Sequence, residues 1–500
     1  MIRAINSFID RTTMYRLVLY YLLVLFIAAL IFGAIGMLPY APLSIIWSGI
    51  VLLLSAWLAN TFLAWVFDAV ANFESVYITA FILTLIITPV AFSDYFGTIT
   101  LIIIAAAAMA SKYLFAIGKK HLFNPAAIAV ALSGLVLGVY ASWWVAGNIP
   151  LLPFILVGGI MMVRKLRKAD VVLAFFATTI LVEAVKSSNP ISGVWAMFLH
   201  SALFFFAFVM LTEPLTMPPT RKLRIAYGVL VGILFVPGLS IGALYFSPEL
   251  ALVAGNFFSY FVSPKGRSML TFVERRALAN GVYEYLFKIN RSLRFKPGQY
   301  LEWTLGAVPL DARGNRRFFT IASAPEDKLV ALGVRFYDKP SAFKRTLASL
   351  TSGASISVAS LSGDFVMPSD TKKKLAFLAG GIGVTPFASM ARHAIIAGES
   401  RDVHLIYSCK TAPEIAYKEV FTNASRVGWR TTYALSDESA QGMHHGFINA
   451  GLIKKEIPDY AERLFYISGP PGMVDAMKAI LLTLGVSRLN IKTDFFPGLA

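Results

Sequence analysis

The stretch LAFLAGGIGVTP, residues 375–386, decides the fold of the C-terminal part of the chain. Its first five residues are apolar, as in a strand buried on both faces, and the glycines after them indicate a tight turn. The proline suits the first turn of a helix. Glycines let the backbone approach a phosphate, and a helix N-terminus favours its negative charge. The sequence therefore predicts a phosphate-binding turn at Gly380, Gly381, Gly383, Thr385 and Pro386.

A second turn of the same form follows another apolar stretch. Residues 464–473, LFYISGPPGM, again lead from a buried strand through small residues into a helix. Strands and helices alternate from residue 372 to residue 500, which predicts a parallel α/β sheet. Ligands of such sheets bind beyond the carboxyl ends of the strands, so both turns are expected to line one cleft. The second turn contributes Ser468, Gly469, Pro470 and Met473.

Residues 268–368 contain short strands with turn signals at even spacing, which predicts a small β-barrel. Its most informative stretch is RFFTIAS, residues 317–323. An arginine is a forked donor that suits a diphosphate. An aromatic side chain two positions later shares the same strand face, where it can lie on a flavin ring, and the next hydroxyl suits the flavin near N5. The candidate residues are Arg317, Phe318, Phe319, Thr320 and Ser323.

Two further motifs follow in the same part of the chain. Ser341 opens the stretch SAFK and offers a hydroxyl and backbone donors to a diphosphate. Gly363 and Phe365 belong to the stretch GDF, which follows the next strand and indicates a contact on the adenine or phosphate side. Their order along the chain supports one flavin-binding domain.

In this order, the segments resemble the ferredoxin–NADP reductase superfamily, from about residue 268 to the C-terminus. The resemblance implies that Arg317 binds the FAD diphosphate, that Phe319 stacks on the flavin, and that Thr320 bonds near N5. It implies that the glycine-rich turn holds NAD(P)H, with Ser468 where many members have a cysteine beside the nicotinamide. Phe319, Thr320 and Ser468 are then the catalytic residues. An aromatic shield of the flavin is implied near the C-terminus, at Phe495 and Phe496.

The choice between NADPH and NADH depends on the residues after the second strand of the sheet. A 2′-phosphate requires cations and hydroxyls there, and Ser408, Lys410 and Tyr417 follow the apolar stretch at 403–407. No acidic residue stands directly at the strand end. The sequence favours NADPH over NADH; the alternative is that these side chains are ordinary solvated surface.

The first 262 residues form long apolar runs. Charged residues make up only 15% of the whole chain, against about a quarter in soluble proteins. A membrane-spanning helix needs about 20 mostly apolar residues. We predict about ten transmembrane helices, near residues 16–37, 43–66, 76–91, 97–117, 126–146, 150–163, 169–185, 193–212, 225–246 and 248–262.

The positive charges fall in alternate loops of this arrangement. With ten spans, sixteen Lys and Arg residues up to residue 276 lie on one side, and Lys186 lies alone on the other. Positive charge is retained on the cytoplasmic side. We therefore expect a multi-pass protein of the cell (inner) membrane, in contact with lipid, with both termini and the C-terminal domains in the cytoplasm. The Lys and Arg residues retained on the cytoplasmic side also account for the net charge of +17. The charge therefore does not indicate nucleic-acid binding, and we expect no nucleic-acid partner.

Cys409 is the single cysteine of the chain. One cysteine excludes a disulfide framework and a four-cysteine iron–sulfur or zinc site within this chain. We expect no metal site. Electrons that leave a flavin here must therefore pass to an organic cofactor or to a partner.

Three segments of the membrane half resemble a family that contains the B subunit of the sodium-pumping NADH:quinone reductase and the D subunit of the Rnf electron-transport complex. They are HLFNPA at 121–126, ESVYIT at 74–79 and TEPLTMPPTRK at 212–222. Many members attach FMN covalently through the threonine of a Ser-Gly-Ala-Thr motif. Trp195 stands at that position here, and an indole forms no phosphoester, so covalent FMN is not expected. A noncovalent flavin or a quinone in the bundle remains open.

The sequence thus predicts three domains: a transmembrane domain at 1–262, an FAD-binding β-barrel at 268–368 and an NAD(P)-binding α/β domain at 372–500. NAD(P)H is expected to reduce FAD, which passes electrons to a membrane-associated acceptor: a quinone, a second flavin or a partner redox protein. In one alternative, the membrane domain is a redox-driven ion-translocating component related to the Rnf and sodium-pumping complexes. In another, it serves as an anchor only.

Overall fold

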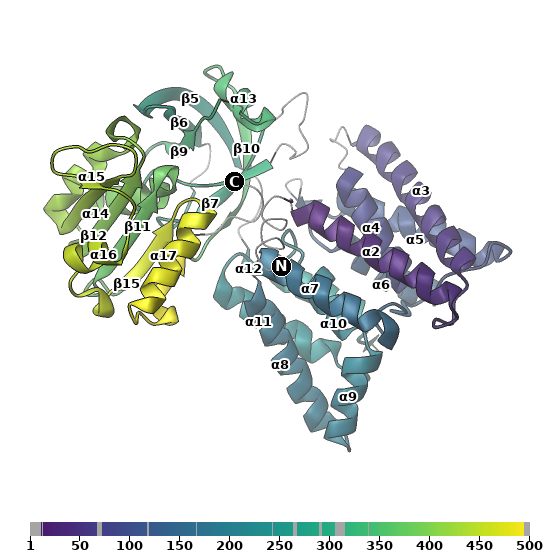
Figure 1. The fold of residues 1–500 in the computed structure, drawn as a ribbon. Coiled ribbons are helices and arrows are strands. Elements are labelled where there is room, and N and C mark those ends of the chain that lie inside the picture. The colour runs from purple at the N-terminus through teal and green to yellow at the C-terminus, as the bar shows by residue number, and fades with distance from the viewer. Residues whose placement is uncertain are drawn as a thin grey trace. The chain divides into compact units, whose positions relative to one another are not determined.

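The structure is a computed structural model that describes residues 12, 14–67, 73–117, 120–166, 168–242, 244–263, 268–289, 293–305, 316–338 and 340–494. Contacts divide the chain into two compact units, Met1–Gly266 and Arg267–Gly498. The first unit is helical and the second contains two sheets with helices (Figure 1).

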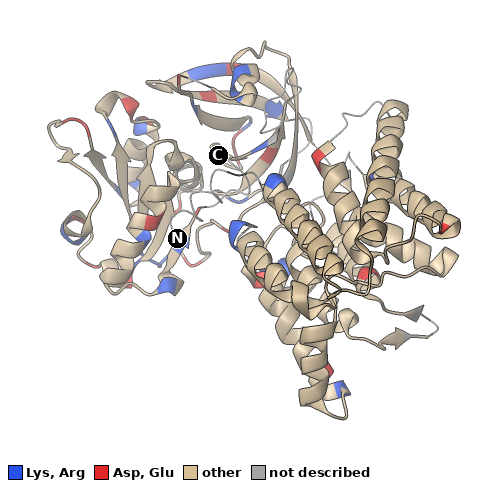
Figure 2. Cartoon of the chain, turned by 45° about the vertical axis from the view of Figure 1, so that its right-hand side comes forward, with Lys and Arg blue, Asp and Glu red and all other residues tan. Residues whose placement is uncertain are grey.

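The described part of the first unit consists of apolar helices. Few positions along them carry the colours of Lys, Arg, Asp or Glu (Figure 2). Two short hairpins interrupt the helices, one of β1 (Ala116–Ile117) and β2 (Lys120–His121) and one of β3 (Ser240–Ile241) and β4 (Leu244–Tyr245). The helices are α2 (Met14–Ala34), α3 (Pro42–Val66), α4 (Phe73–Ile86), α5 (Tyr95–Leu114), α6 (Pro125–Leu137), α7 (Leu152–Leu166), α8 (Ala169–Lys186), α9 (Pro190–His200), α10 (Leu203–Phe205), the π-helical turn η2 (Phe206–Met210), α11 (Arg221–Phe235) and α12 (Pro248–Val262).

The prediction of ten membrane spans is wrong for the described residues. Four helical segments are long and apolar enough to cross a membrane: α2, α3, α5 and the segment Ile149–Leu166, which includes α7. A fifth is present if α9 and the segment Leu203–Met210 count as one span, but the two are bent by 66°. The count of apolar runs was too high because several runs contain helix ends, so the helices within them are shorter than about 20 residues.

Two helix ends show the physical reason. The side chain of Asn124 accepts a hydrogen bond from the backbone N–H of Ala127 and so caps α6, and Gly138 ends that helix in a left-handed conformation. Both features are common at helix termini. The apolar run at 126–146 therefore yields a helix of 13 residues, too short to span a bilayer by itself.

Two of the segments quoted for the membrane-family resemblance meet in the structure. The Glu213 carboxylate accepts hydrogen bonds from Asn124 Nδ2 at 3.0 Å and from Thr216 Oγ1 at 3.0 Å, and its other oxygen lies 3.4 Å from His121 Nε2. A carboxylate among apolar helices requires such donors. The contact joins the two segments through their polar residues. Membership of that family stays a prediction.

The second unit begins with a six-stranded antiparallel sheet. Its strands lie in the order β8-β7-β10-β5-β6-β9. Strands β8 and β9 stand at the two ends of this order. The Ala322 N–H, just after β8, donates to the Ala331 carbonyl of β9 at 2.9 Å. The predicted β-barrel is not shown, and it stays a prediction. Helix α13 (Ala342–Ala348) lies between β9 and β10 in the chain. The strands are β5 (Ser268–Ala279), β6 (Val282–Ile289), β7 (Tyr300–Thr304), β8 (Arg316–Thr320), β9 (Val330–Arg335) and β10 (Ser355–Ser362).

The predicted parallel α/β sheet is confirmed. All its strand pairs are parallel, in the order β14-β13-β12-β11-β15-β16. The strands are β11 (Leu375–Gly380), β12 (Val403–Cys409), β13 (Trp429–Leu435), β14 (His444–His445), β15 (Leu464–Ser468) and β16 (Ile491–Thr493). The main helices are α14 (Thr385–Ala397), α15 (Lys418–Ala424), α16 (Ala450–Glu456) and α17 (Pro471–Thr483) (Figure 1).

Strand β11 is the centre of this sheet, and all six of its residues are buried. Side chains alternate along a strand, so Phe377 packs in the cluster with α14 and α15, and Leu378 packs in the cluster with α16 and α17. The neighbours of β11 are β12, which follows it in the chain, and β15, which comes last but one. The strand order therefore reverses at β11, which is where open α/β sheets bind ligands.

Candidate functional site

The two predicted turns meet directly beyond β11 and β15. A Cβ atom built on Gly383 would lie 2.5 Å from Gly469 Cα and 2.8 Å from the Ser468 carbonyl carbon. Both neighbours are backbone atoms, so only glycine allows this approach. On the other side of the junction, Gly380 packs against the sulfur of Met473 in α17. The two turns are therefore in contact, and the cleft that they were expected to line stays a prediction.

The glycine-rich turn leads into α14 through a short 3-10 helix, Gly381–Val384. Gly381 has a φ of +51°, which an L side chain rarely adopts. Thr385 Oγ1 donates a hydrogen bond to the Ile382 carbonyl at 3.2 Å, and Pro386 occupies the first turn of α14. The turn thus leads directly into a 13-residue helix, and the Thr385 backbone N–H donates to the Ile382 carbonyl.

Ser468 is held in place by a residue that the sequence did not single out. Its hydroxyl, in a residue only 2% exposed, donates to Asp494 Oδ2 at 3.1 Å. The Asp494 backbone N–H donates in turn to the Ile467 carbonyl at 2.9 Å. Pro470 follows as the N-cap residue of α17. Asp494 lies 26 positions from Ser468, so no local pattern marks the pair.

The predicted flavin strand is β8. Arg317 and Phe319 share one face, as predicted, because both contact the buried ring of Phe343: the guanidinium carbon lies 5.6 Å from that ring, and the Phe319 and Phe343 centroids are 5.6 Å apart. Phe318 lies on the other face, with its ring centroid 5.7 Å from that of Tyr300. Phe343 itself was not predicted as part of the site.

Thr320 carries a buried hydroxyl. The residue is 3% exposed, and its Oγ1 atom has no hydrogen-bond partner among the residues that the structure describes. A buried hydroxyl without a partner is unfavourable by about 1–3 kcal/mol. The Thr320 hydroxyl is therefore available to a bound group.

Other predicted residues of the first sheet have structural contacts. Ser323 Oγ accepts a hydrogen bond from the backbone N–H of Ala331 at 3.0 Å. Ser341 caps the short helix α13 by accepting from the Lys344 N–H. Gly363 has a φ of +121°. Phe365 is buried in the core of the α/β sheet, where its ring packs against Phe387 and Tyr466. A cofactor contact at these four positions stays a prediction.

The residues expected around a 2′-phosphate are spread out. Ser408 is half-buried in β12 and Lys410 is exposed beyond its end. Tyr417 is buried, and the Arg392 guanidinium carbon lies 5.4 Å from its ring, so it is not part of a surface with Lys410. Phe495 and Phe496 lie outside the described residues.

An ion pair at the glycine-rich turn was missed. Arg335 Nη2 donates to Glu414 Oε1 at 2.7 Å, and Arg335 Nη1 lies 3.6 Å from the position of a Cβ atom on Gly381. The pair places a cation from the first sheet beside the turn of the second. In sequence, Arg335 is an ordinary strand end, and its partner is 79 residues away.

Cys409 ends β12 and is buried. Burial raises the pKa of its thiol to about 11. The thiolate is the reactive form, so we expect iodoacetamide at pH 8 to label the folded protein at least roughly 100-fold more slowly than the denatured protein, and the rate to rise as the pH approaches 11. Mass spectrometry of timed samples measures this; equal rates in both states would contradict the burial of Cys409.

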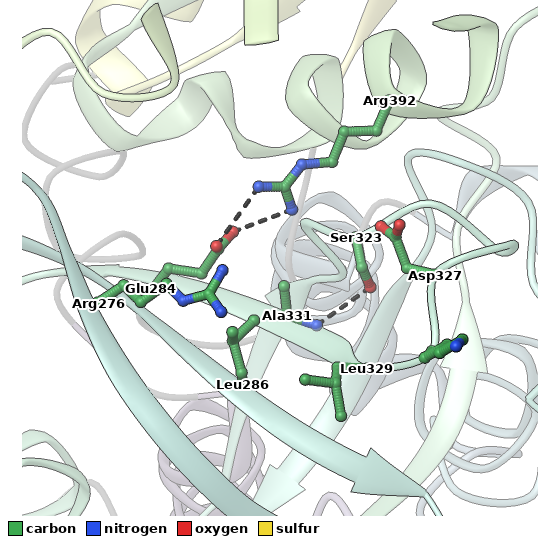
Figure 3. Close-up of a pocket in the computed structure, with 9 residues that line it drawn as sticks. Arg276, Glu284, Leu286, Ser323, Asp327, Leu329, Ala331 and Arg392 are labelled. Atoms are coloured by element: carbon green, nitrogen blue, oxygen red, sulfur yellow. Dashed lines mark hydrogen bonds and ion pairs between the residues drawn. The ribbon is translucent and has the colours of Figure 1, made fainter. Parts of the chain in front are cut away.

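A pocket lies elsewhere in the second unit. It has a volume of about 370 Å³ and is lined by residues of the first sheet and by Arg392 of α14 (Figure 3). Ser323 is the one predicted site residue among those that line it. The pocket is therefore distinct from the meeting point of the two turns.

Comparison with known proteins agrees with this geometry. The family model "Oxidoreductase NAD-binding domain" matches residues 377–479. The Phenol hydroxylase P5 protein of Acinetobacter pittii is 24% identical over 234 residues, which cover 45% of this chain and 64% of that protein. The Glycine betaine monooxygenase reductase subunit of Chromohalobacter salexigens is 25% identical over 209 residues, which cover 40% of this chain and 56% of that protein.

The C-terminal part of the chain is thus similar to oxidoreductases and reductase components, and the family model matches its NAD-binding domain. The crystal structure of the Amycolatopsis cytochrome P450 reductase GcoB is also similar to it, with 25% sequence identity and a TM-score of 0.42, over 46% of this chain and 69% of that one. The chain spans less than two thirds of the length of the two relatives named above.

Proposed function

We propose that the protein is a membrane-bound flavoprotein that oxidises NAD(P)H through FAD and delivers the electrons to a membrane-associated acceptor. One observation carries this proposal: the turns after β11 and β15 meet at the point where the strand order reverses, next to the sheet that contains β8. Gly333 of that sheet faces Thr385 at the start of α14, with Thr385 Cγ2 2.8 Å from the position of a Cβ atom on Gly333. Domain limits of 1–262, 268–368 and 372–500 belong to the same proposal.

The residues of β8 fit FAD. Arg317 is the donor for the diphosphate, Phe319 is the ring surface, and the Thr320 hydroxyl supplies a donor that the described protein atoms leave unused. A bound flavin supplies the capacity to accept a hydride and to release electrons to a further acceptor. The protein contributes orientation, exclusion of water and a hydrogen bond at the flavin ring.

The glycine-rich turn fits the diphosphate of a nicotinamide nucleotide. Gly380, Gly381 and Gly383 let the phosphates approach the backbone, and the N-terminus of α14 favours their charge. Ser468, buried and fixed by Asp494, is placed where the two turns meet and would orient the nicotinamide. Ser408 and Lys410 lie after β12, and on this basis we propose NADPH as the preferred substrate.

The acceptor is a quinone, a second flavin or a partner redox protein. One relative is named as the reductase subunit of a monooxygenase, which supports a partner protein. The four or five apolar helical segments support a location in the cell membrane, in contact with lipid. We propose a cytoplasmic reductase module, because NAD(P)H is a cytoplasmic substrate.

Thr320→Val tests the flavin site. The substitution keeps the shape and removes the hydroxyl, so we expect anaerobic flavin reduction by NAD(P)H to slow about 5- to 30-fold, the equivalent of one or two kcal/mol. The flavin-free form should melt at the same or a higher temperature, because an unpaired buried hydroxyl is removed. Thr346→Val, in α13, is the control and should leave the rate unchanged. An unchanged rate for Thr320→Val would remove Thr320 from the proposed site.

A further inference from the structure

Helix α14 is hydrogen-bonded to the segment that follows β8, the predicted flavin strand. The Ser389 hydroxyl, in a residue that is 0% exposed, donates to the Ser323 carbonyl at 2.7 Å. Arg392 lies one turn further along the same face of the helix, and its Nη1 donates to the Ala322 carbonyl at 3.1 Å. Ala322 and Ser323 follow β8 within three residues of its last residue, Thr320.

A buried carboxylate completes this attachment. Glu284 of β6 is 3% exposed, and its Oε1 lies 3.0 Å from Arg392 Nη1. In Figure 3 the Arg392 side chain extends from the helix towards Glu284 at the edge of the pocket. The Glu284 carboxylate is buried, whereas the Arg392 side chain is 21% exposed, and a buried carboxylate requires a charged partner in a fixed geometry. Arg392 therefore joins α14 both to the segment after β8 and to strand β6.

The same helix carries the glycine-rich turn at its other end. Thr385, the first residue of α14, is four positions before Ser389 and seven before Arg392. A helix of this length is rigid, so a tilt at Ser389 and Arg392 displaces the turn. Misplacement of reacting groups by about 1 Å lowers a rate by about 100-fold.

We propose that Arg392 and Ser389 are positioning residues, which fix the nicotinamide-binding turn relative to the flavin strand and so set the rate of hydride transfer without contacting either cofactor. The inference rests on the proposed function. It assigns a role to the Glu284–Arg392 pair, which lies at the pocket rather than at the meeting point of the turns.

The experiment compares single substitutions in the full chain. Arg392→Ala is expected to lower the limiting rate of flavin reduction by NAD(P)H about 10- to 100-fold, with the dissociation constant for NAD(P)H within threefold and flavin content unchanged. Arg392→Lys keeps the charge but loses the forked geometry, so it should recover part of the rate. His393→Ala is the matched control, because His393 is adjacent on α14 and pairs with Glu326 at 2.9 Å in an exposed position; its rate should stay within twofold of the wild type.

Each outcome decides the inference. A limiting rate for Arg392→Ala within twofold of the wild type overturns it, and so does a loss of NAD(P)H affinity at an unchanged limiting rate. If Arg392→Ala fails to fold, Ser389→Ala decides: a reduction rate three- to tenfold lower supports positioning, and an unchanged rate overturns it. Failure of the wild-type flavin to be reduced at all overturns the proposed function, which is a separate result.

Discussion

Gly383→Ala is expected to lower the rate of flavin reduction by NAD(P)H at least about 100-fold while FAD remains bound. The added Cβ would meet Gly469 Cα at 2.5 Å and Gly469 N at 2.6 Å. These are backbone atoms that cannot rotate away, so the two turns must separate. FAD should stay because its proposed residues lie on β8, in the other sheet. Anaerobic stopped-flow absorbance at the flavin band measures the rate, and the extracted flavin measures occupancy.

Gly472→Ala is the matched control for this substitution. Gly472 lies in the first turn of α17, three residues after Gly469, and a Cβ on it would have no neighbour within 4 Å among the described atoms. We expect its rate to remain within twofold of the wild type. Equal rates for Gly383→Ala and the wild type would show that the meeting of the turns is not needed for the reaction.

Arg317→Ala is expected to weaken FAD binding about 10- to 100-fold, because a hydrogen bond to a charged group contributes about 1.5–3 kcal/mol. The residue is 8% exposed and lies over the Phe343 ring, so the substitution also removes packing beside Phe319. Flavin fluorescence during titration of the flavin-free protein with FAD gives the dissociation constant.

Arg275→Ala is the control for loss of a strand arginine. Arg275 is exposed on β5 and lies over the Tyr283 ring at 4.9 Å, a contact of the same kind as that between Arg317 and Phe343. Its removal should leave FAD affinity within twofold. If both variants bind FAD as tightly as the wild type, the diphosphate is held elsewhere.

The C-terminal sheet was predictable because its signals are local. An apolar run such as residues 375–379, followed by glycines, favours a strand buried on both faces that ends in a close turn. The strands of the first sheet were predictable from their local patterns. The relation between its two end strands was not, because pairing between strands that are distant in sequence produces no pattern in either strand alone.

The membrane half was overcounted for a definable reason. Hydropathy reports where residues are apolar and does not report where helices end. Asn124 caps one helix inside an apolar region, and a 66° bend follows His200 inside another. Ser201 at that bend has an extended backbone and accepts a hydrogen bond from Leu203 N–H. Neither the helix cap at Asn124 nor the bend after His200 changes the mean hydropathy of the surrounding residues.

The candidate site was predictable only where its residues are neighbours in sequence. Arg335, Arg392 and Asp494 act through partners 79, 108 and 26 positions away, and single residues of these types carry no pattern. Tyr417 was expected beside a 2′-phosphate from its place after β12, but it is buried, with a φ of +59° and the Arg392 guanidinium over its ring. Contacts between residues so far apart in the sequence depend on tertiary packing.

The most direct test of the proposed function is anaerobic reduction of the purified full chain. The protein in detergent, loaded with FAD, is mixed with NADPH or NADH while the flavin absorbance is recorded. We predict stoichiometric FAD and complete bleaching within seconds by NADPH. A folded protein that binds no flavin, or whose bound flavin neither nucleotide reduces, would contradict the proposal.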